Sequence, residues 1–213
     1  MFSRRNLLIA SALSAVSLPT FAAPRFNAGK EYLVLNPAQP SPQDKIEVIL
    51  FFAYTCSHCM QFDPVFEQWK EKLPSDVTVR YNPVAWQPKF LPFTQAYYAF
   101  ESLKLLDKLH TPFFESIIYQ TRSYNFDDPA ADIAAFVKEN GVDVDLWNKT
   151  MASFGVQNKA RVAMQTWQAY GIDATPMVGV GGRFTTGPHL VGTRQATTAC
   201  LDFLIDEVRK SRR

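Results

Sequence analysis

The pattern of apolar and polar positions predicts a βαβ unit early in the chain. Residues 46–53 form a nearly continuous apolar run, which is typical of a central strand covered on both faces. The next apolar positions recur with the period of a helix, at Phe62, Phe66, Trp69 and Leu73. This spacing predicts a helix that begins near Cys56 and ends at Pro74. Residues 77–81 then alternate between apolar and polar side chains, which indicates a second strand.

The middle of the chain has only helical patterns, and strands return near its end. We expect helices at residues 90–109, 112–120, 128–140, 143–154 and 159–170. Residues 177–186, with Gly181-Gly182 in their middle, predict a β-hairpin, and residues 193–210 predict a closing helix. With a short strand at 31–35, the predicted class is α/β. A β-α-β half is followed by a helical insertion and by an α-β-β-α half that completes the same sheet.

Residues 1–22 have the layout of a bacterial secretory signal. Arg4 and Arg5 precede an apolar stretch that is too short to span a bilayer as a helix. Thr20-Phe21-Ala22 provides a small-x-small cleavage site, so we expect cleavage after Ala22. The two arginines also fit twin-arginine export, and the route stays open between that and general secretion. Either route delivers the chain beyond the cytoplasm.

Charge and cysteine content limit the function classes. Without Arg4 and Arg5 the chain has 20 basic and 20 acidic residues, and this balance argues against a nucleic-acid partner. Three cysteines are too few, and odd in number, for a disulfide-stapled exported fold. Cys200 lies in an apolar helical pattern and is assigned no role.

Cys56 and Cys59 are separated by two residues directly after the predicted central strand. Four interpretations compete: a zinc site, a structural disulfide, two inert core cysteines, or a dithiol that is repeatedly oxidised and reduced. The second half of a zinc site is missing, because Cys200, His110 and His189 show no ligand spacing, so we expect no metal. The low cysteine count argues against a structural disulfide, and the export context against inert core cysteines.

The position of Cys56 favours redox chemistry. The first residues of a helix have backbone N–H groups without intrahelical partners, and these stabilise an anion such as a thiolate. The spacing lets Cys59 reach Cys56 and close a small disulfide while its own sulfur stays more buried. We therefore expect Cys56 to be the sulfur that reacts with substrate and Cys59 to resolve the intermediate. His58, between them, adds a donor or a positive charge.

A second signal lies far along the chain, where Thr175-Pro176 opens the predicted hairpin. A C-x-x-C after the first strand of a βαβ unit, with Thr-Pro before a later hairpin, resembles the thioredoxin fold. The secretory signal, the Cys-x-His-Cys sequence and the helical insertion resemble the DsbA family of periplasmic thiol-disulfide oxidases. The implied organisation is a signal peptide at 1–22, thioredoxin-like parts at 23–85 and 157–213, and an all-helical insertion at 86–156.

The resemblance implies a site and a set of partners. Pro176 would be cis and packed against the disulfide, and the backbone of Thr175 would pair with an extended substrate. The dipeptide Ser57-His58 would tune the redox poise, with Ser57 where the best-known members carry proline. The substrates would be unfolded, newly exported proteins with cysteines in the periplasm. A membrane quinone-linked partner of the DsbB type would reoxidise the protein. We expect a monomer with no cofactor besides the Cys56-Cys59 disulfide.

Two alternatives remain at this point. A reductase or isomerase of the same fold would be kept reduced and would reshuffle wrong disulfides. Family members with that role usually carry an N-terminal dimerisation domain, which the short segment before residue 31 does not provide. The other alternative is a holdase-like module that binds unfolded chains and in which the cysteines are incidental. Leu50 departs from the pattern of the thioredoxin fold, because many proteins with this fold bury a carboxylate at this position.

Overall fold

The computed structural model describes residues 26–212, so the signal predicted at residues 1–22 lies outside them. One five-stranded mixed sheet organises the fold, with the strand order β1-β5-β4-β2-β3. Its strands are β1 Tyr32–Val34, β2 Ile46–Phe52, β3 Val77–Pro83, β4 Met177–Val180 and β5 Phe184–Thr186. Strands β2 and β3 run parallel, whereas the other neighbours run antiparallel. The predicted β-α-β and α-β-β-α halves therefore complete one sheet, as expected.

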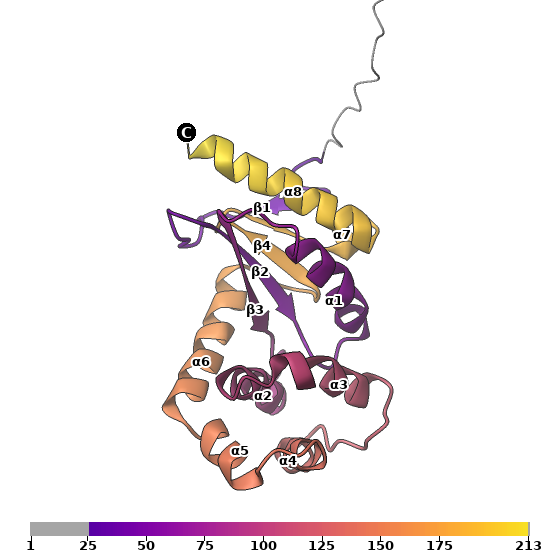
Figure 1. The fold of residues 1–213 in the computed structure, drawn as a ribbon. Coiled ribbons are helices and arrows are strands. Elements are labelled where there is room, and N and C mark those ends of the chain that lie inside the picture. The colour runs from indigo at the N-terminus through magenta and orange to yellow at the C-terminus, as the bar shows by residue number, and fades with distance from the viewer. Residues whose placement is uncertain (1–25, 213) are drawn as a thin grey trace, which may run out of the picture.

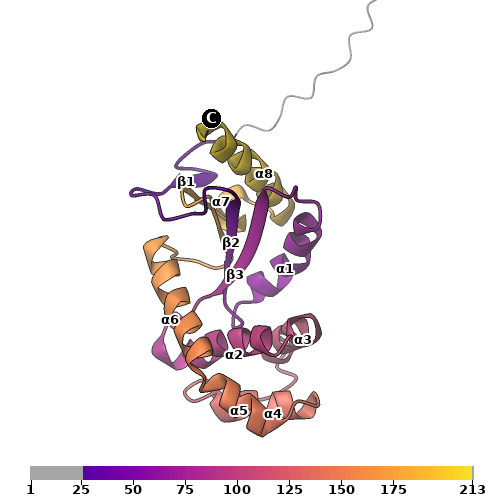
Figure 2. The same ribbon diagram turned by 60° about the vertical axis from the view of Figure 1, so that its left-hand side comes forward.

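Helices surround the sheet and extend beyond one end of it (Figure 1). They are α1 Ser57–Lys70, α2 Leu91–Ser102, α3 Leu106–Ile118, α4 Ala130–Glu139, α5 Val144–Met151, α6 Phe154–Ala169, α7 Pro188–Val191 and α8 Arg194–Ser211, with a 3₁₀ turn at Pro88–Phe90. Figure 2 shows α1 and α6 on opposite sides of the sheet, with α2 to α5 grouped below it. Within residues 26–212, no helix has both the length and the apolar character to cross a membrane.

The apolar run of β2 is buried on both faces, which confirms it as a central strand. Alternate side chains point to opposite faces of a strand. Val48 and Leu50 belong to the large core cluster that includes residues of α1 and α8. Ile49 and Phe51 belong to a second cluster, which contains Tyr170 after α6. Helices thus cover both faces of the strand that leads into the two cysteines.

The prediction of one helix over residues 90–109 is wrong. Helix α2 ends at Ser102, and α3 begins at Leu106 and continues through Pro112, where we had expected a new helix to start. Lys104 has a positive φ of 58°, and the Leu105 N–H donates to the Phe100 carbonyl over 2.7 Å. This hydrogen bond closes a Schellman turn without the usual glycine. Apolar positions continue through the turn, so the hydrophobic pattern did not reveal it.

Helix α6 begins five residues before the predicted start at residue 159. Ser153 caps it, because its hydroxyl accepts a hydrogen bond from the Val156 N–H over 3.3 Å. Helix α6 therefore runs across the boundary predicted between residues 156 and 157, and the insertion shares this helix with the second half of the sheet domain. The short helix α7 was not predicted.

Candidate active site

Cys56 lies at the junction between β2 and α1. It is the N-cap residue of α1 with extended backbone angles, φ −108° and ψ 110°. Its side chain is half-buried, whereas Ser57 and His58 are exposed and Cys59 is only 2% exposed. The structure thus bears out the expected difference in access to the two sulfurs.

The loop that precedes β4 reaches the same place from the second half of the chain. The Thr175-Pro176 peptide bond is cis, as the resemblance implied, and Asn36-Pro37 is also cis. The Cys56 Sγ lies 3.3 Å from the Thr175 carbonyl oxygen, to which the thiol donates a hydrogen bond. Cys56 and the Thr-Pro pair, the two sequence signals, therefore meet at one site.

The surroundings of Cys56 favour its thiolate. The pKa of Cys56 is lowered from the ordinary 9.0 to about 5, chiefly because the Cys59 side chain hydrogen-bonds to it. Burial opposes this change in pKa, while hydrogen bonds from the Thr175 side chain and from the Cys59 and His58 backbone N–H groups support it. His58 thus acts on the Cys56 pKa through its backbone, and a role of its imidazole stays a prediction.

The buried Cys59 is affected in the opposite direction. Burial raises the pKa of the Cys59 thiol well above 9.0, and its hydrogen bond with Cys56 adds to this effect. No carboxylate lies at the position of Leu50, which is itself buried. As the odd spacing along the strand predicted, Glu47 lies on the face of β2 opposite to Leu50. Its carboxylate pairs with Arg80 at 2.8 Å. In the reduced protein these surroundings therefore favour a thiolate at Cys56 and a thiol at Cys59 at neutral pH.

Tyr54, two residues before Cys56, fixes the junction to the helical insertion. Its hydroxyl and Nδ1 of His110 on α3 are 2.7 Å apart, within hydrogen-bonding distance. The Tyr54 ring packs against Phe113 and Phe114, with centroid separations of 4.7 Å to each. The other ring nitrogen of His110 faces Asp63 on α1 at 3.5 Å. Helix α3 of the insertion thus fixes the position of Tyr54, two residues before Cys56.

A groove of 660 Å³ opens beside the two cysteines, and we call it the Pro176 groove. Its lining residues are His58, Ala174, Thr175, Pro176, Pro188, His189, Gly192, Thr193, Arg194 and Gln195. Sequence reasoning found those near Pro176 but missed His189 and Arg194, on α7 and α8. The turn marked by Gly187-Pro188 and Gly192 after the hairpin was the available signal for a short element here.

Gly187 allows α7 to approach the loop that contains Pro176. A Cβ at residue 187 would lie 2.7 Å from the Pro176 carbonyl oxygen and 3.2 Å from Nδ1 of His189. We expect Gly187→Ala to lower the free energy of unfolding by about 1 to 3 kcal/mol, because backbone atoms must shift to relieve this overlap. Thermal unfolding measures the effect. Gly155→Ala is the control, because its Cβ would meet only Ser153 Oγ at 4.0 Å. Equal unfolding temperatures of the two variants would contradict the packing argument.

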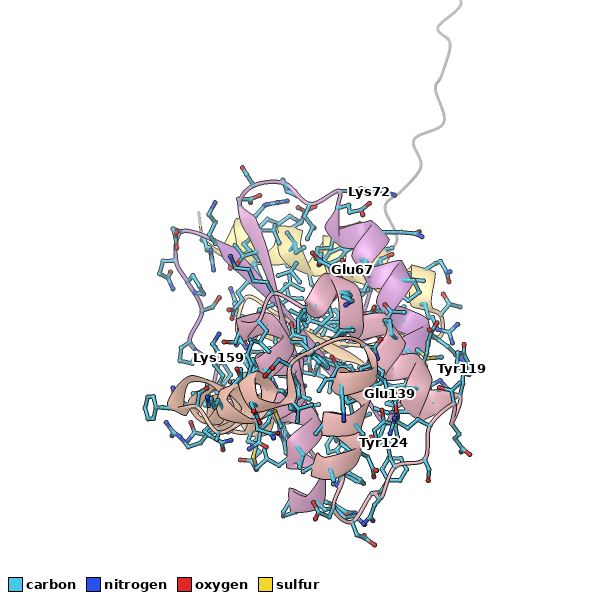
Figure 3. All side chains as sticks on the ribbon, turned by 60° about the horizontal axis from the view of Figure 1, so that its bottom comes forward. Glu67, Lys72, Tyr119, Tyr124, Glu139 and Lys159 are labelled. Atoms are coloured by element: carbon cyan, nitrogen blue, oxygen red, sulfur yellow. The ribbon has the colours of Figure 1, made fainter. Side chains whose placement is uncertain are left out.

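A larger cavity of 760 Å³ lies between α1, α2, α3, α6 and β3, and Glu67 and Lys159 on its lining are labelled in Figure 3. Its basic side chains are paired with carboxylates. Lys70 contacts Glu67 at 2.5 Å, and Lys159 contacts Glu101 at 2.8 Å. Neither cysteine lines it. Among residues 26–212, no group of three or more His, Cys, Asp or Glu side chains is arranged to hold a metal ion.

The sequence and the fold of this chain are similar to those of known proteins. The family model described as Thioredoxin matches residues 39–197. The thiol:disulfide interchange protein DsbA of Bordetella parapertussis is 37% identical over 208 residues, which are 96% of this chain and 97% of that protein. This chain belongs to the DsbA family. The DsbA of Burkholderia cepacia is 33% identical over 96% of this chain and 95% of that protein. The crystal structure of Pseudomonas aeruginosa DsbA, at 29% identity, has a TM-score of 0.80 and covers 87% of this chain and 96% of that one.

Membership of the DsbA family establishes the class of reaction. The protein is a thiol-disulfide oxidoreductase with a role in disulfide formation, built on the thioredoxin fold with a helical insertion. Within this fold, Cys56 and Cys59 lie side by side at the start of α1.

Proposed function

We propose that the protein donates the Cys56-Cys59 disulfide to newly exported proteins in the periplasm, through a mixed disulfide at Cys56. The observation that carries this proposal is the contrast between the two thiols: Cys56 is half-buried at the N-cap of α1 and has a lowered pKa, whereas Cys59 is buried and has a raised pKa. A thiolate at Cys56 stabilises the reduced form, and stabilising the reduced form makes the disulfide a better oxidant. Cys56 is also the sulfur that substrate can reach, since Cys59 is buried.

The transfer takes place in two exchange steps. A substrate thiolate attacks Cys56 Sγ, the Cys56-Cys59 bond breaks, and Cys59 leaves with the electron pair and takes up a proton. A second substrate thiolate then attacks the substrate sulfur of the mixed disulfide, and Cys56 leaves as a thiolate. The substrate loses two electrons and gains a disulfide, while the protein gains two electrons and becomes a dithiol. The low pKa of Cys56 favours its departure in the second step.

The state of Cys59 supports oxidation over reduction. A reductase must resolve the mixed disulfide by attack of its buried cysteine, which returns the substrate in the reduced form. That attack requires a Cys59 thiolate, and burial raises the pKa of this thiol and so slows the attack. Release of an oxidised substrate needs no such ionisation. Where a second substrate thiolate is present, it therefore resolves the mixed disulfide faster than Cys59 does.

The partners and location extend the proposal. Thr175 offers its backbone beside Cys56 to an extended substrate strand, as in binding by strand addition. Ser57 and His58 would tune the redox poise from their exposed positions at the start of α1. A membrane quinone-linked protein of the DsbB type would take the two electrons from the reduced dithiol. The protein would act as a monomer in the periplasm without a further cofactor, after removal of residues 1–22.

Direct disulfide transfer tests the proposal. The oxidised protein is mixed with an equal amount of a client, a reduced and unfolded protein that contains two cysteines. After acid quenching, the masses of both proteins are measured by mass spectrometry. We expect the client to lose two hydrogen atoms and this protein to gain two. The Cys56→Ser, Cys59→Ser double variant is the control and should leave the client reduced. A client that stays reduced with the oxidised protein would contradict the proposed function.

A further inference from the structure

We propose that the Pro176 groove selects substrate segments that carry an acidic residue two positions from their cysteine. The inference rests on the proposed function, because it names the segment that occupies the groove while the mixed disulfide exists. It concerns which clients react fastest and leaves the exchange chemistry unchanged. Three features of the groove support it: the charges on its lining, the pairing of Arg194, and its place beside Cys56.

The lining of the Pro176 groove has basic but no acidic side chains. Arg194 carries a fixed positive charge, and His58 and His189 are the two other side chains on the lining that can become positively charged. Both histidines are exposed. Asp173 is the acid closest in sequence to Thr175, and it does not line the groove. The fixed charge that the groove presents to an incoming chain, the guanidinium of Arg194, is therefore positive.

A neutral partner positions Arg194, so the positive charge of its guanidinium is not balanced by a carboxylate. Its Nη2 donates a hydrogen bond to the side-chain oxygen of Gln61 on α1, a neutral partner. By contrast, Arg80, Arg122 and Arg209 each pair with a carboxylate. Among residues 26–212, no carboxylate lies within ion-pair distance of Arg194. The guanidinium is thus positioned by α1 and retains donors that fit a carboxylate.

The geometry sets which substrate positions reach these charges. A substrate strand paired with Thr175 places its cysteine against Cys56, which lies 3.3 Å from the Thr175 carbonyl. Side chains alternate along a strand, so those two residues before and after the cysteine point to the same surface. They lie about 7 Å from the cysteine along the strand. Thr175, Pro176 and His58 all line the groove, so it begins beside the position that the substrate cysteine takes, and we expect the side chain two residues away to be the one that reaches it.

The reaction rates of two matched peptides test the inference. Two peptides are identical except that the residues two before and two after their single cysteine are aspartate in one and lysine in the other. Each is reacted in reduced form with the oxidised protein, and the rate of mixed-disulfide formation is measured. We expect the aspartate peptide to react about tenfold faster at low salt, and the ratio to shrink as salt is added. Free thiolate concentrations are matched from the measured pKa of each peptide thiol.

Variants assign the preference to Arg194. Arg194→Gln should bring the ratio of the two rates close to one, and Arg194→Glu should reverse it. The control is Lys149→Gln, which removes the same charge from an exposed position on α5, at the opposite end of the molecule in Figure 1, and should keep the ratio. Equal rates for both peptides with the unchanged protein would overturn the inference and leave the proposed function intact. If neither peptide forms a mixed disulfide, it is the proposed function that fails.

Discussion

Cys59→Ser should trap a stable mixed disulfide with a substrate peptide. The reduced variant is given a peptide whose cysteine is activated as a disulfide with a coloured leaving group. The Cys56 thiolate attacks the peptide sulfur and releases the coloured thiol, and the Thr175 side chain and the backbone N–H groups of residues 58 and 59 still favour this thiolate in the variant. Without a resolving thiol the adduct should persist, whereas the unchanged protein should pass through it and end as the Cys56-Cys59 disulfide. Mass spectrometry of the quenched reaction distinguishes the two products.

Two matched variants define the reactive sulfur. Cys56→Ser should form the adduct about 100-fold more slowly at neutral pH, because the remaining thiol of Cys59 is buried and protonated. Cys200→Ala should behave like the unchanged protein, since Cys200 is buried and burial raises its pKa to about 11. An adduct on Cys59 in the unchanged protein, or equal rates for Cys56→Ser and Cys59→Ser, would reverse the assigned roles.

The stability that ionisation of Cys56 gives to the reduced protein should be lost in acid. The folded protein lowers the Cys56 pKa from 9.0 to about 5, so ionisation of this thiol stabilises the reduced fold. The contribution is complete above pH 9, declines as the pH falls, and is lost below about pH 5. Cys59 stays neutral over this range because its pKa is raised. After an allowance for the partial exposure of Cys56, the contribution at about pH 7 is about 1 to 2 kcal/mol.

Thermal unfolding of the two redox forms measures this effect. The Tm of the reduced form should fall, relative to the Tm of the oxidised form, by roughly 2 to 8 °C between about pH 7 and about pH 4.5. Reduced Cys56→Ser is the control: it has no thiolate at residue 56, so it should lack this part of the pH dependence. A difference in Tm that stays constant over this range would mean that the Cys56 thiolate is not stabilised by the fold.

The parts of the site that lie in one local segment could be predicted from the sequence. The apolar run of β2 and the helical spacing after it placed Cys56 at a helix N-terminus and Cys59 one turn inside. That position alone implied an accessible thiolate and a buried thiol. Thr175-Pro176 was also found, because proline at the start of a strand is a strong local signal. Its contact with Cys56 followed from the resemblance to a known fold.

The parts that depend on distant contacts could not be predicted. Arg194 is one of many basic residues in the sequence, and only the fold places it on the lining of the Pro176 groove and within hydrogen-bonding reach of Gln61 on α1. Gly187 reads as an ordinary turn residue until the fold brings the Pro176 carbonyl against it. The turn at Lys104 was missed because a lysine takes the conformation for which glycine is the usual signal. Local propensity and tertiary packing disagree at these positions, and packing decides.

The equilibrium reduction potential of the Cys56-Cys59 pair tests the central claim most directly. The Cys200→Ala protein is equilibrated with glutathione buffers of known ratio, and the fraction of dithiol is counted by alkylation and mass spectrometry. The Cys56 thiolate stabilises the reduced form, so we expect a potential well above the value of about −270 mV for thioredoxin. A potential at or below that of thioredoxin would contradict the account, and the protein would then be a reductant of disulfides.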